Sequence, residues 1–427
     1  MERYNEYRDS NVQWIGEIPS HWEQRRVRYT GKSRNGLTYS PYDVSEDGQG
    51  ILVLRSSNIQ DGKLLLDDNV YVKKEISPEL MVKKGDILIC SRNGSRDLVG
   101  KLTMIDRDIN ASFGAFMMIY RTYMWAPFME KVLSVAIQSY KTLFSTSTIN
   151  QLTNDIFKDF VIPIPPLAEQ EMIVSYLDSK TSKIDVYVAD KEKEIQLLQE
   201  LKQKTIADAV TKGLNPNVKL KDGRTTFFGQ IPAHWEERKM KYCFTERSEK
   251  NHPDEPILCA TQSQGVIPQS MYQNRVVVVN KGFEGLKFVK VGDFVISLRS
   301  FEGGIEYAYY QGIISAAYTI LTPKDAVCAE YFKFLFKCYP FIQLLQTCVT
   351  GIREGQNINY QMLGRKYIPL PSLDEQQAIV AYIEEKCQKI DTLTTELQAE
   401  IDYLKEYKQR LIADVVTGQV NVQNINI

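Results

Sequence analysis

Arginine, amide and hydroxyl side chains follow several short apolar runs in this sequence, and their chemistry suits contact with nucleic acids. Arginine can donate two hydrogen bonds to guanine, asparagine and glutamine can pair with adenine, and serine and threonine commonly contact phosphates. In the first half these residues are Arg55, Ser56, Ser57, Asn58, Arg92, Asn93 and Arg96. In the second half they are Thr261, Gln262, Gln264, Arg299 and Ser300. They are our candidate DNA-contacting residues, although ordinary surface loops have a similar composition.

Catalytic signatures are absent from the sequence. It has no GxxxxGK[ST] phosphate loop, no GxGxxG, no HExxH and no GxSxG. His21 and His234 occupy equivalent places in a repeated Ile-Pro-x-His-Trp-Glu segment without a partner nucleophile, which favours a packing role. Pro165-Pro166 is followed by leucine, so the motif with which amino-methyltransferases grip a base is missing. We expect no catalysis, no metal and no cofactor on this chain.

The composition is that of an ordinary globular protein. A length of 427 residues predicts two or more domains, and no apolar run approaches the ~20 residues that span a bilayer. The polar N-terminus resembles neither a signal nor a transit peptide. Seven cysteines without CxxC spacing predict reduced thiols and a cytoplasmic location. The net charge of −1 means that any DNA contact must come from local basic patches or from a partner.

The chain consists of two similar halves. The segment IPIPPLAEQEMIVSYLDSKTSKID at Ile162–Asp185 returns 206 residues later as IPLPSLDEQQAIVAYIEEKCQKID at Ile368–Asp391. A second segment, Trp14–Tyr29, matches Phe227–Tyr242. Two copies of such a large unit predict an internal pseudo-two-fold.

Between the repeated segments lies a strand-rich region in each half. A Gly-Asp turn leads into an apolar run at Lys83–Arg92 and again at Lys290–Arg299. We predict further strands at Ile51–Leu54, Ala115–Tyr120, Pro256–Cys259, Val276–Val279 and Ser315–Leu321. We predict helices at Pro127–Ser139 and Ala329–Thr347, followed by the pairs Ile149-Asn150 and Ile358-Asn359 and by Pro-containing strands at Val161–Pro165 and Tyr367–Pro371.

A long helix is predicted at the end of each half. Residues 167–212 and 372–417 contain no proline or glycine, and Gly213 and Gly418 follow as expected beyond helix ends. A capping box is expected over Ser372–Glu375. At 1.5 Å per residue, 46 residues would extend ~69 Å. A helix this long must pack on another, and its twin, running antiparallel, is the obvious candidate.

A coiled-coil seam is predicted for both helices. The second copy places Ile390, Leu397, Leu404 and Leu411 seven residues apart, with Leu393, Ile401 and Val415 beside them. The first has Ile184, Val188, Ile195, Leu198 and Leu201 on a similar stripe, weakened by Lys191 and Thr205. The charged helix faces are explained by solvation, with partner binding as the alternative.

The net charge of each part of the chain and a cluster of tyrosines give weaker indications of nucleic-acid contact. Residues 14–166 carry 19 Lys and Arg against 17 Asp and Glu, and residues 227–371 carry 16 against 13. The helix at 167–212 carries 7 against 9, so the sign favours anion contact through the strand-rich parts. Tyr307, Tyr309 and Tyr310 could stack on a base, but cross-strand packing is the favoured interpretation.

Two motifs together resemble those of the specificity subunit of type I restriction–modification systems. One is WIGEIPxHWE at Trp14–Glu23, echoed at Phe228–Glu236; the other is IPxPxLxEQ at Ile162–Gln170 and Ile368–Gln376. Their duplicated order covers essentially the whole chain. Phe227-Phe228-Gly229-Gln230 stands where the first copy has Trp14-Ile15-Gly16-Glu17, which leaves the shape of the motif intact.

This resemblance implies an α+β fold. Two similar globular target-recognition domains would be joined by two long antiparallel coiled-coil helices about a pseudo-two-fold. The implied parts are recognition domain 1 at 1–166, a central spacer helix at 167–213, recognition domain 2 at 214–371 with a linker at 214–226, and a C-terminal spacer helix and tail at 372–427.

The resemblance also implies a function. The chain would be a non-catalytic subunit that reads an asymmetric bipartite site in double-stranded DNA. Partner methyltransferase subunits would bring S-adenosylmethionine and methylate adenine, and restriction/translocase subunits would use ATP and Mg to cut unmodified DNA. The complex would be cytoplasmic, with no membrane contact.

Two other hypotheses remain open at this stage. The chain could be a non-catalytic coiled-coil scaffold that organises protein partners without reading DNA. It could also be a stand-alone enzyme with an unrecognised site, in which case the purified chain should turn over S-adenosylmethionine or ATP.

Overall fold

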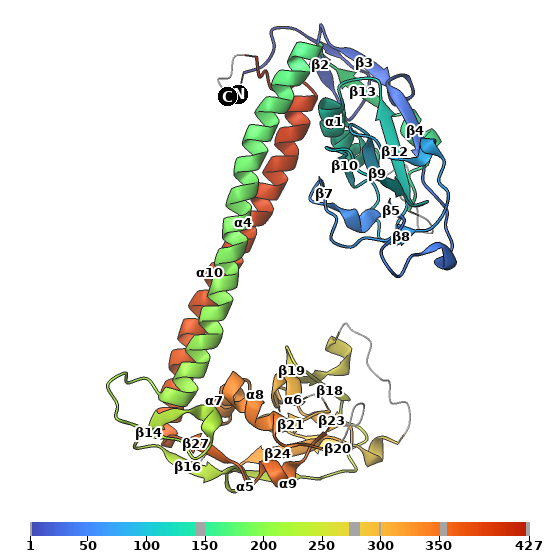
Figure 1. Ribbon diagram of the computed structural model, residues 1–427. Helices are drawn as coiled ribbons and strands as arrows, with labels where there is room; N and C mark the ends of the chain where they lie inside the picture. The colour runs from blue at the N-terminus through green and yellow to red at the C-terminus, as the bar shows by residue number, and fades with distance from the viewer. Residues whose placement is uncertain are drawn as a thin grey trace. The chain divides into compact units, whose positions relative to one another are not determined.

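The computed structural model describes residues 2–141, 150–272, 282–298, 300–325, 327–350 and 357–423 (Figure 1). The chain forms two compact units. Unit 1 comprises Met1–Lys191 and Ala399–Ile427, and unit 2 comprises Glu192–Gln398.

Unit 1 is built on a four-stranded antiparallel sheet. Its order is β10 (Leu102–Met104), β9 (Ile87–Cys90), β12 (Met117–Thr122) and β4 (Gly31–Asn35). Alternate side chains of a strand face opposite ways. Met118 and Tyr120 therefore join the core beneath helix α1 (Ala126–Ser139), whereas Met117 and Ile119 join a second core. That second core includes a small sheet ordered β11 (Ala111–Phe113), β5 (Ile51–Leu54) and β8 (Tyr71–Val72).

Unit 2 repeats the central sheet. Strands β22 (Glu306–Tyr307), β21 (Phe294–Ile296), β24 (Thr319–Pro323) and β17 (Phe244–Arg247) follow the same order as their counterparts in unit 1. Helices α7 (Ala329–Leu335) and α8 (Tyr339–Gln346) cover the core in place of α1. The remaining strands form the pairs β18 (Leu258–Thr261) with β19 (Gly265–Pro268), and β20 (Lys287–Val289) with β23 (Gly312–Ile314). The prediction of one fold carried twice is confirmed.

The repeated Gly-Asp turns support these sheets from within. Asp86 and Asp293 are almost fully buried, and each accepts a 2.8 Å hydrogen bond from the backbone three residues earlier. Each also pairs with an arginine of the same sheet, Asp86 with Arg121 of β12 at 2.6 Å and Asp293 with Arg247 of β17 at 2.9 Å. The turns are structural elements in both units.

The repeated His-Trp segments anchor the starts of the long helices. They precede strands β3 (Glu23–Arg26) and β16 (Glu236–Lys239), which pair with β13 (Val161–Ile164) and β27 (Tyr367–Leu370). In unit 1, Glu169 accepts a 2.9 Å hydrogen bond from the Trp22 indole and contacts His21 at 2.6 Å. In unit 2, His234 contacts Glu375 at 3.0 Å. Trp22 and Trp235 are buried, which confirms the predicted packing role for the tryptophans of these segments, whereas His21 and His234 are exposed and contact the glutamates.

The two long helices, α4 (Leu167–Lys212) and α10 (Leu373–Val416), lie side by side and antiparallel within each unit (Figure 1). Within unit 1, Lys408 pairs with Asp185 and Tyr187 donates a 3.0 Å hydrogen bond to Glu400. Within unit 2, Lys202 pairs with Asp391 at 2.6 Å. By the 206-residue repeat, Lys202 corresponds to Lys408 and Asp185 corresponds to Asp391. In unit 1 the lysine lies on α10 and the aspartate on α4, and in unit 2 the lysine lies on α4 and the aspartate on α10. Both units therefore use the same helix register.

Both helices show alternating steps of four and three between buried or half-buried positions, as a coiled-coil seam requires. In α4 the seam positions are 177, 181, 184, 188, 191, 195, 198, 202, 205 and 209. In α10 they are 383, 387, 390, 394, 397, 401, 404, 408, 411 and 415. The seam is confirmed, but the prediction was wrong for Leu201 and Leu393, which are 51% and 39% exposed, because Lys202 and Thr394 occupy those steps.

The first and last segments that the structure describes lie together in unit 1. The backbone N–H of Asn421 donates a 2.9 Å hydrogen bond to the Glu2 carbonyl, and the Tyr7 hydroxyl donates one of 2.7 Å to the Gly418 carbonyl. The pair of strands β1 (Tyr7–Asp9) and β2 (Glu17–Pro19) is repeated in unit 2 by β14 (Leu220–Asp222) and β15 (Gln230–Pro232). In unit 2 the chain runs directly from α4 into β14.

Several predicted elements needed correction. The strand expected at Ser315–Leu321 begins only at Thr319, as β24, because a turn at Ser315–Tyr318 separates β23 from β24. The helix expected at Ala329–Thr347 divides into α7 and α8 because Pro340 starts a new helix. The capping box is half formed: the backbone N–H of Glu375 donates to Ser372, but the Glu375 carboxylate contacts His234. Val276–Val279 and Ile149 lie outside the described residues.

Candidate nucleic-acid interface

In unit 1 the two predicted loops meet. Ser56 begins a short 3-10 turn after β5, and Asn93 follows β9. The Asn93 side-chain amide donates a 3.4 Å hydrogen bond to the Ser56 hydroxyl, although 37 residues separate them. The packing of the small sheet on the central sheet therefore gathers two sequence-distant polar segments at one place.

Some of these side chains shape the loop itself. Asn58 is buried, accepts a 2.9 Å hydrogen bond from the Arg55 backbone and donates one of 2.9 Å to the Leu65 carbonyl. The Arg55 guanidinium pairs with Asp68 at 2.7 Å. Arg55 Nε and Ser57 Oγ are buried and find no hydrogen-bond partner in the described parts of the chain. Asn58 is thus engaged in holding the turn.

Other side chains are free to meet a ligand. Arg92 and Arg96 are exposed, and no acidic partner for either occurs within the described residues. The Arg92 guanidinium lies 5.3 Å from the centre of the Phe116 ring, which is 60% exposed. Phe116 was not among the predicted contact residues, because its place in an apolar run is typical of a core residue.

In unit 2 the predicted residues Gln262 and Gln264 form the tip of the β18–β19 hairpin. Both are exposed, together with Ser263 between them. Thr261 is buried and closes the turn, donating a 3.0 Å hydrogen bond to the Gly265 carbonyl and accepting one of 3.0 Å from the Gln264 backbone. Thr261 therefore orients the tip.

The second predicted segment of unit 2 lies against this tip. Ser300 is buried and accepts a 2.8 Å hydrogen bond from the Ser297 backbone at the start of helix α6 (Ser300–Gly303). At the end of α6, a Cβ added to Gly303 would lie only 2.9 Å from the Gln262 side chain. Arg299 lies outside the described residues. Unit 2 therefore brings the end of α6, the helix that begins at the predicted residue Ser300, next to the hairpin tip.

Tyrosines flank the hairpin tip. Tyr307 is half-buried and packs edge-on against Phe294 at 5.5 Å, which confirms its predicted packing role. Tyr309 is 45% exposed, and its ring lies so close to Gly265 that an added Cβ would come within 2.9 Å of it. The Lys333 ammonium lies 5.7 Å from the Tyr309 ring. Tyr309, one of the three tyrosines considered for base stacking, is a neighbour of the tip, and so is Lys333, which the sequence pattern did not identify.

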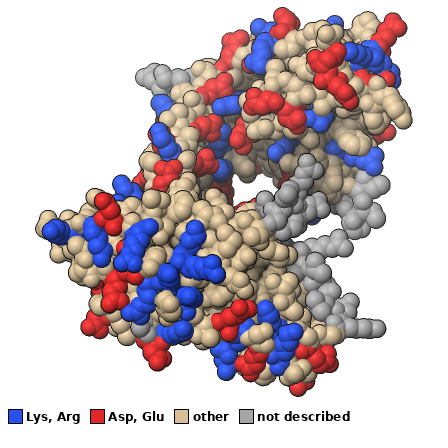
Figure 2. All heavy atoms as spheres, turned by 60° about the horizontal axis from the view of Figure 1, so that its bottom comes forward, with Lys and Arg blue, Asp and Glu red and all other residues tan. Residues whose placement is uncertain are grey.

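A basic surface occupies another face of unit 2. Figure 2 shows lysine and arginine side chains gathered on the side that carries β16 and β27. Arg224 and Lys239 lie 4.8 and 5.4 Å from the Tyr367 ring, and Lys241 lies 5.0 Å from the exposed ring of Tyr242. Charge without exposed amides suits phosphates more than base edges.

The corresponding cations of unit 1 are neutralised. Arg26 and Arg28 stand where unit 2 has Lys239 and Lys241, and both pair with Asp159. Arg365 occupies the position of Asp159 in the second half. The two units therefore differ in surface charge at equivalent places.

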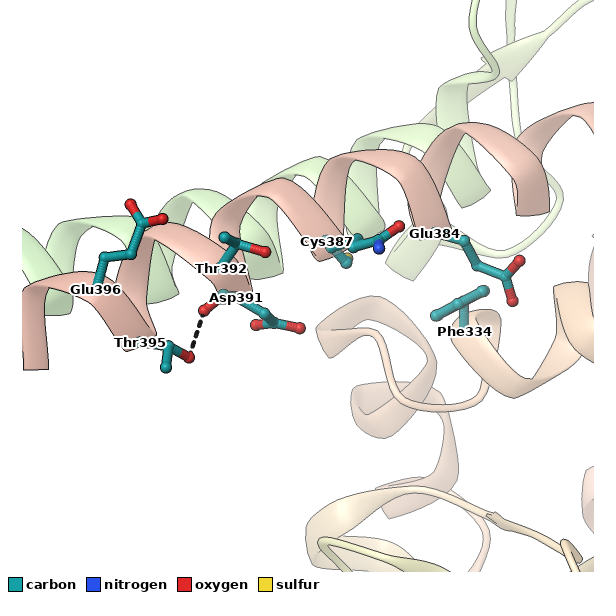
Figure 3. A pocket seen from close by; sticks show the side chains of 8 residues that line it. Phe334, Glu384, Cys387, Asp391, Thr392, Thr395 and Glu396 are labelled. Carbon is teal, nitrogen blue, oxygen red and sulfur yellow. Dashed lines mark hydrogen bonds between the residues drawn. The ribbon is translucent and has the colours of Figure 1, made fainter. Parts of the chain in front are cut away.

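The long helices carry a groove in each unit. In unit 2 it has a volume of about 570 Å³ and is lined by α10 and by Phe334 of α7 (Figure 3). Glu384, Cys387 and Asp391 of this groove correspond by the 206-residue offset to Asp178, Thr181 and Asp185, which line a groove of about 670 Å³ in unit 1. The groove is thus a repeated feature of the frame. The charged residues that line it are acidic in unit 2, whereas in unit 1 Lys63, Lys131 and Lys408 line it as well.

Three of the buried thiols are poor nucleophiles. Burial raises the pKa of Cys90 and of Cys243 to about 11 and that of Cys338 to about 12. Among the residues that the structure describes, no cluster of three His, Cys, Asp or Glu side chains could hold a metal ion. No helix in the same residues is long and apolar enough to cross a bilayer.

Comparison with known proteins agrees with this architecture. Residues 19–197 and 217–403 match the sequence model of the type I restriction modification DNA specificity domain, one copy in each half. The chain is 22% identical over 426 residues to the type I restriction enzyme EcoKI specificity subunit of Escherichia coli (strain K12), covering 96% of this chain and 91% of that protein. It is 29% identical over 210 residues to the type I restriction enzyme StySPI specificity subunit of Salmonella potsdam, covering 46% and 44%.

The fold matches as well. A chain from a structure describing the assembly and conformational transition of the type I R-M system superposes with a TM-score of 0.68 at 16% identity, covering 94% of this chain and 99% of that one. A scaffold that never reads DNA is not favoured by these relationships. This chain belongs to the type I restriction modification DNA specificity family, as a specificity subunit that recognises DNA.

Proposed function

We propose that the chain reads an asymmetric, two-part DNA site, with one half-site for each unit. The observation that carries this proposal is a repeated frame bearing unlike loops. The central sheets have the same strand order, and each unit gathers two loops. Unit 1 presents Arg92 and Arg96, whereas unit 2 presents Gln262 and Gln264. Unlike side chains on equivalent frames suit unlike base sequences.

Each side chain has a distinct expected role. Arg92 and Arg96 would donate to guanine O6 and N7, while Gln262 and Gln264 would pair with adenine. A bidentate contact of this kind discriminates by about 1–3 kcal/mol. Phe116 and Tyr309 would flank these contacts with an apolar face. The basic surface of unit 2 would contact phosphates, which adds affinity without sequence preference.

The long helices would set the distance between the half-sites. Helices of 46 and 44 residues correspond to about 69 and 66 Å at 1.5 Å per residue. The matched register pairs, Lys202–Asp391 and Lys408–Asp185, support a rigid spacer. A rigid spacer would fix rotational phase along the duplex as well as separation.

Methyltransferase and restriction subunits would assemble on this chain and supply the chemistry. S-adenosylmethionine, ATP and Mg would bind those partners, and this chain would bind none of them. The equivalent grooves at Glu384–Asp391 and Asp178–Asp185 support docking of two copies of one partner. We place the complex in the cytoplasm, where its seven free cysteines would stay reduced.

Mapping methylated adenines in a host that carries this chain and its methyltransferase tests the proposal. We expect methylation within a two-part asymmetric sequence separated by a fixed gap. Inserting seven residues after Val188 and after Thr394 keeps the seam and adds about 10 Å of helix, equivalent to about three base pairs. A lengthened gap supports the spacer role, and an unchanged gap contradicts it.

A further inference from the structure

We propose that Lys337 is a positioning residue that clamps the recognition loops of unit 2, and that Glu306 holds Lys337 in place. This inference rests on the proposed function, because it concerns how the hairpin tip and α6 are held for reading one half-site. Neither residue was among the candidates from the sequence.

The Lys337 ammonium joins three separate segments. It donates hydrogen bonds of 3.2 Å to the Gln262 carbonyl at the hairpin tip and of 2.9 Å to the Gly303 carbonyl at the end of α6. It also pairs at 2.7 Å with Glu306 of β22. An ammonium has three donors, so these three acceptors use all of them. One side chain thus fixes the backbone of the tip relative to both neighbours.

Glu306 is committed to this single partner. It is 1% exposed, and its second oxygen finds no hydrogen-bond partner among the described residues. Burial raises the pKa of Glu306 to about 7, although Lys337 acts in the opposite direction. A carboxylate buried with one cation holds that cation firmly, because leaving either charge alone in the interior is costly.

The backbone around the clamp leaves little room for adjustment. Gly304 has a φ of +84°, and a Cβ there would collide with the Phe336 carbonyl, next to Lys337 itself. Gly303 is similarly close to the Gln262 side chain. The end of α6 is therefore pressed between the hairpin tip and the α7–α8 connection, and the direction of the Gln262 side chain depends on this contact.

Unit 1 joins its loops differently, through the side-chain hydrogen bond of 3.4 Å from Asn93 to Ser56. A change at Lys337 should therefore affect one half-site and leave the other as an internal control. A loss of stability would not affect one half-site alone, because unfolding abolishes recognition of both half-sites.

The test uses the full chain in complex with its methyltransferase subunits. Duplexes with single base changes in either half-site are titrated by fluorescence anisotropy at pH 8, together with thermal unfolding. The main variant combines Lys337→Met with Glu306→Met, which removes the ion pair without leaving a buried charge. We expect about a 10-fold loss of discrimination at the half-site of unit 2 and less than a 2-fold change at the other.

Two further variants complete the experiment. Glu306→Gln keeps an acceptor for Lys337 and should retain discrimination within about 3-fold. Lys337→Arg keeps the charge, and so the fold, but its planar fork cannot reproduce three convergent bonds, so we expect a loss restricted to the same half-site. The clamp is overturned if the folded double variant discriminates like the wild type at both half-sites. If the double variant does not fold, the same result for Lys337→Arg overturns it. A wild-type complex that does not distinguish half-sites would instead refute the proposed function.

Discussion

Truncation of Arg92 should remove recognition of one base pair without unfolding the protein. The guanidinium is exposed and has no acidic partner in the described residues, so Arg92→Ala leaves no buried charge behind. Its backbone contributes separately, through a 3.1 Å hydrogen bond to the Phe116 carbonyl that alanine preserves. We therefore expect the free energy of unfolding to change by less than about 0.5 kcal/mol.

The effect on DNA should be larger. A bidentate arginine–guanine contact contributes about 1–3 kcal/mol, which corresponds to roughly 5- to 150-fold in affinity. Anisotropy titrations with every base substituted in turn should show this loss at a single position of the half-site read by unit 1. The matched control is Lys241→Ala on the basic surface of unit 2, which should weaken all sequences alike and reduce the salt slope by about 1. An equal loss over both half-sites for Arg92→Ala, or a lowered melting temperature, would refute the reasoning.

Three other outcomes follow from the structure. The charges of one register pair are exchanged in the double variant Lys202→Asp with Asp391→Lys. It should recover about 0.5–1 kcal/mol of unfolding free energy relative to either single variant. A double-mutant cycle that shows no coupling would exclude a register role. Asp86→Ala should cost about 1–3 kcal/mol, because the Lys83 backbone N–H and the partly exposed Arg121 guanidinium both lose their acceptor. The exposed Asp106→Ala should cost less than about 0.5 kcal/mol, and equal melting temperatures would contradict this difference. The pKa of Glu306 is raised from 4.5 to about 7 in the folded state. Between these two pH values the folded state keeps a proton that the unfolded state has released. This protonation therefore stabilises the fold at low pH, and the stabilisation is lost as pH rises through about 7. Urea unfolding from pH 5 to pH 8 should show this loss, and it should shrink in Glu306→Gln; identical pH profiles would be contrary evidence.

The long helices were predictable because their signals are local. Uninterrupted helix-forming residues, heptad spacing and a terminal glycine are all read along the chain, and the predicted bounds of α4 agree with the structure. The seam was less certain at Leu201 and Leu393, since an apolar residue beside a polar one does not reveal which of them faces the partner helix. Pairing of Lys202 and Lys408 with aspartates allows these lysines to occupy seam positions.

The recognition loops were predictable only in part. Polar residues after apolar strands identified Ser56, Asn93 and Gln262, because this pattern depends on nearby residues. Their convergence depends on how sheets pack, and 37 residues separate Asn93 from Ser56. Lys337 lies 75 residues from Gln262, so its contact with the hairpin tip has no local signature. Phe116 looks like a core residue until its exposure is known, and exposure also decides between packing and stacking for Tyr309.

The central claim, that each unit reads its own half-site, is tested most directly by replacing residues 30–160 with the equivalent region of a relative and mapping adenine methylation in the host. We predict that one half of the methylated sequence changes while the other half and the gap between them stay the same. Methylation of the original sequence in both halves, or a change in both halves together, would contradict the account.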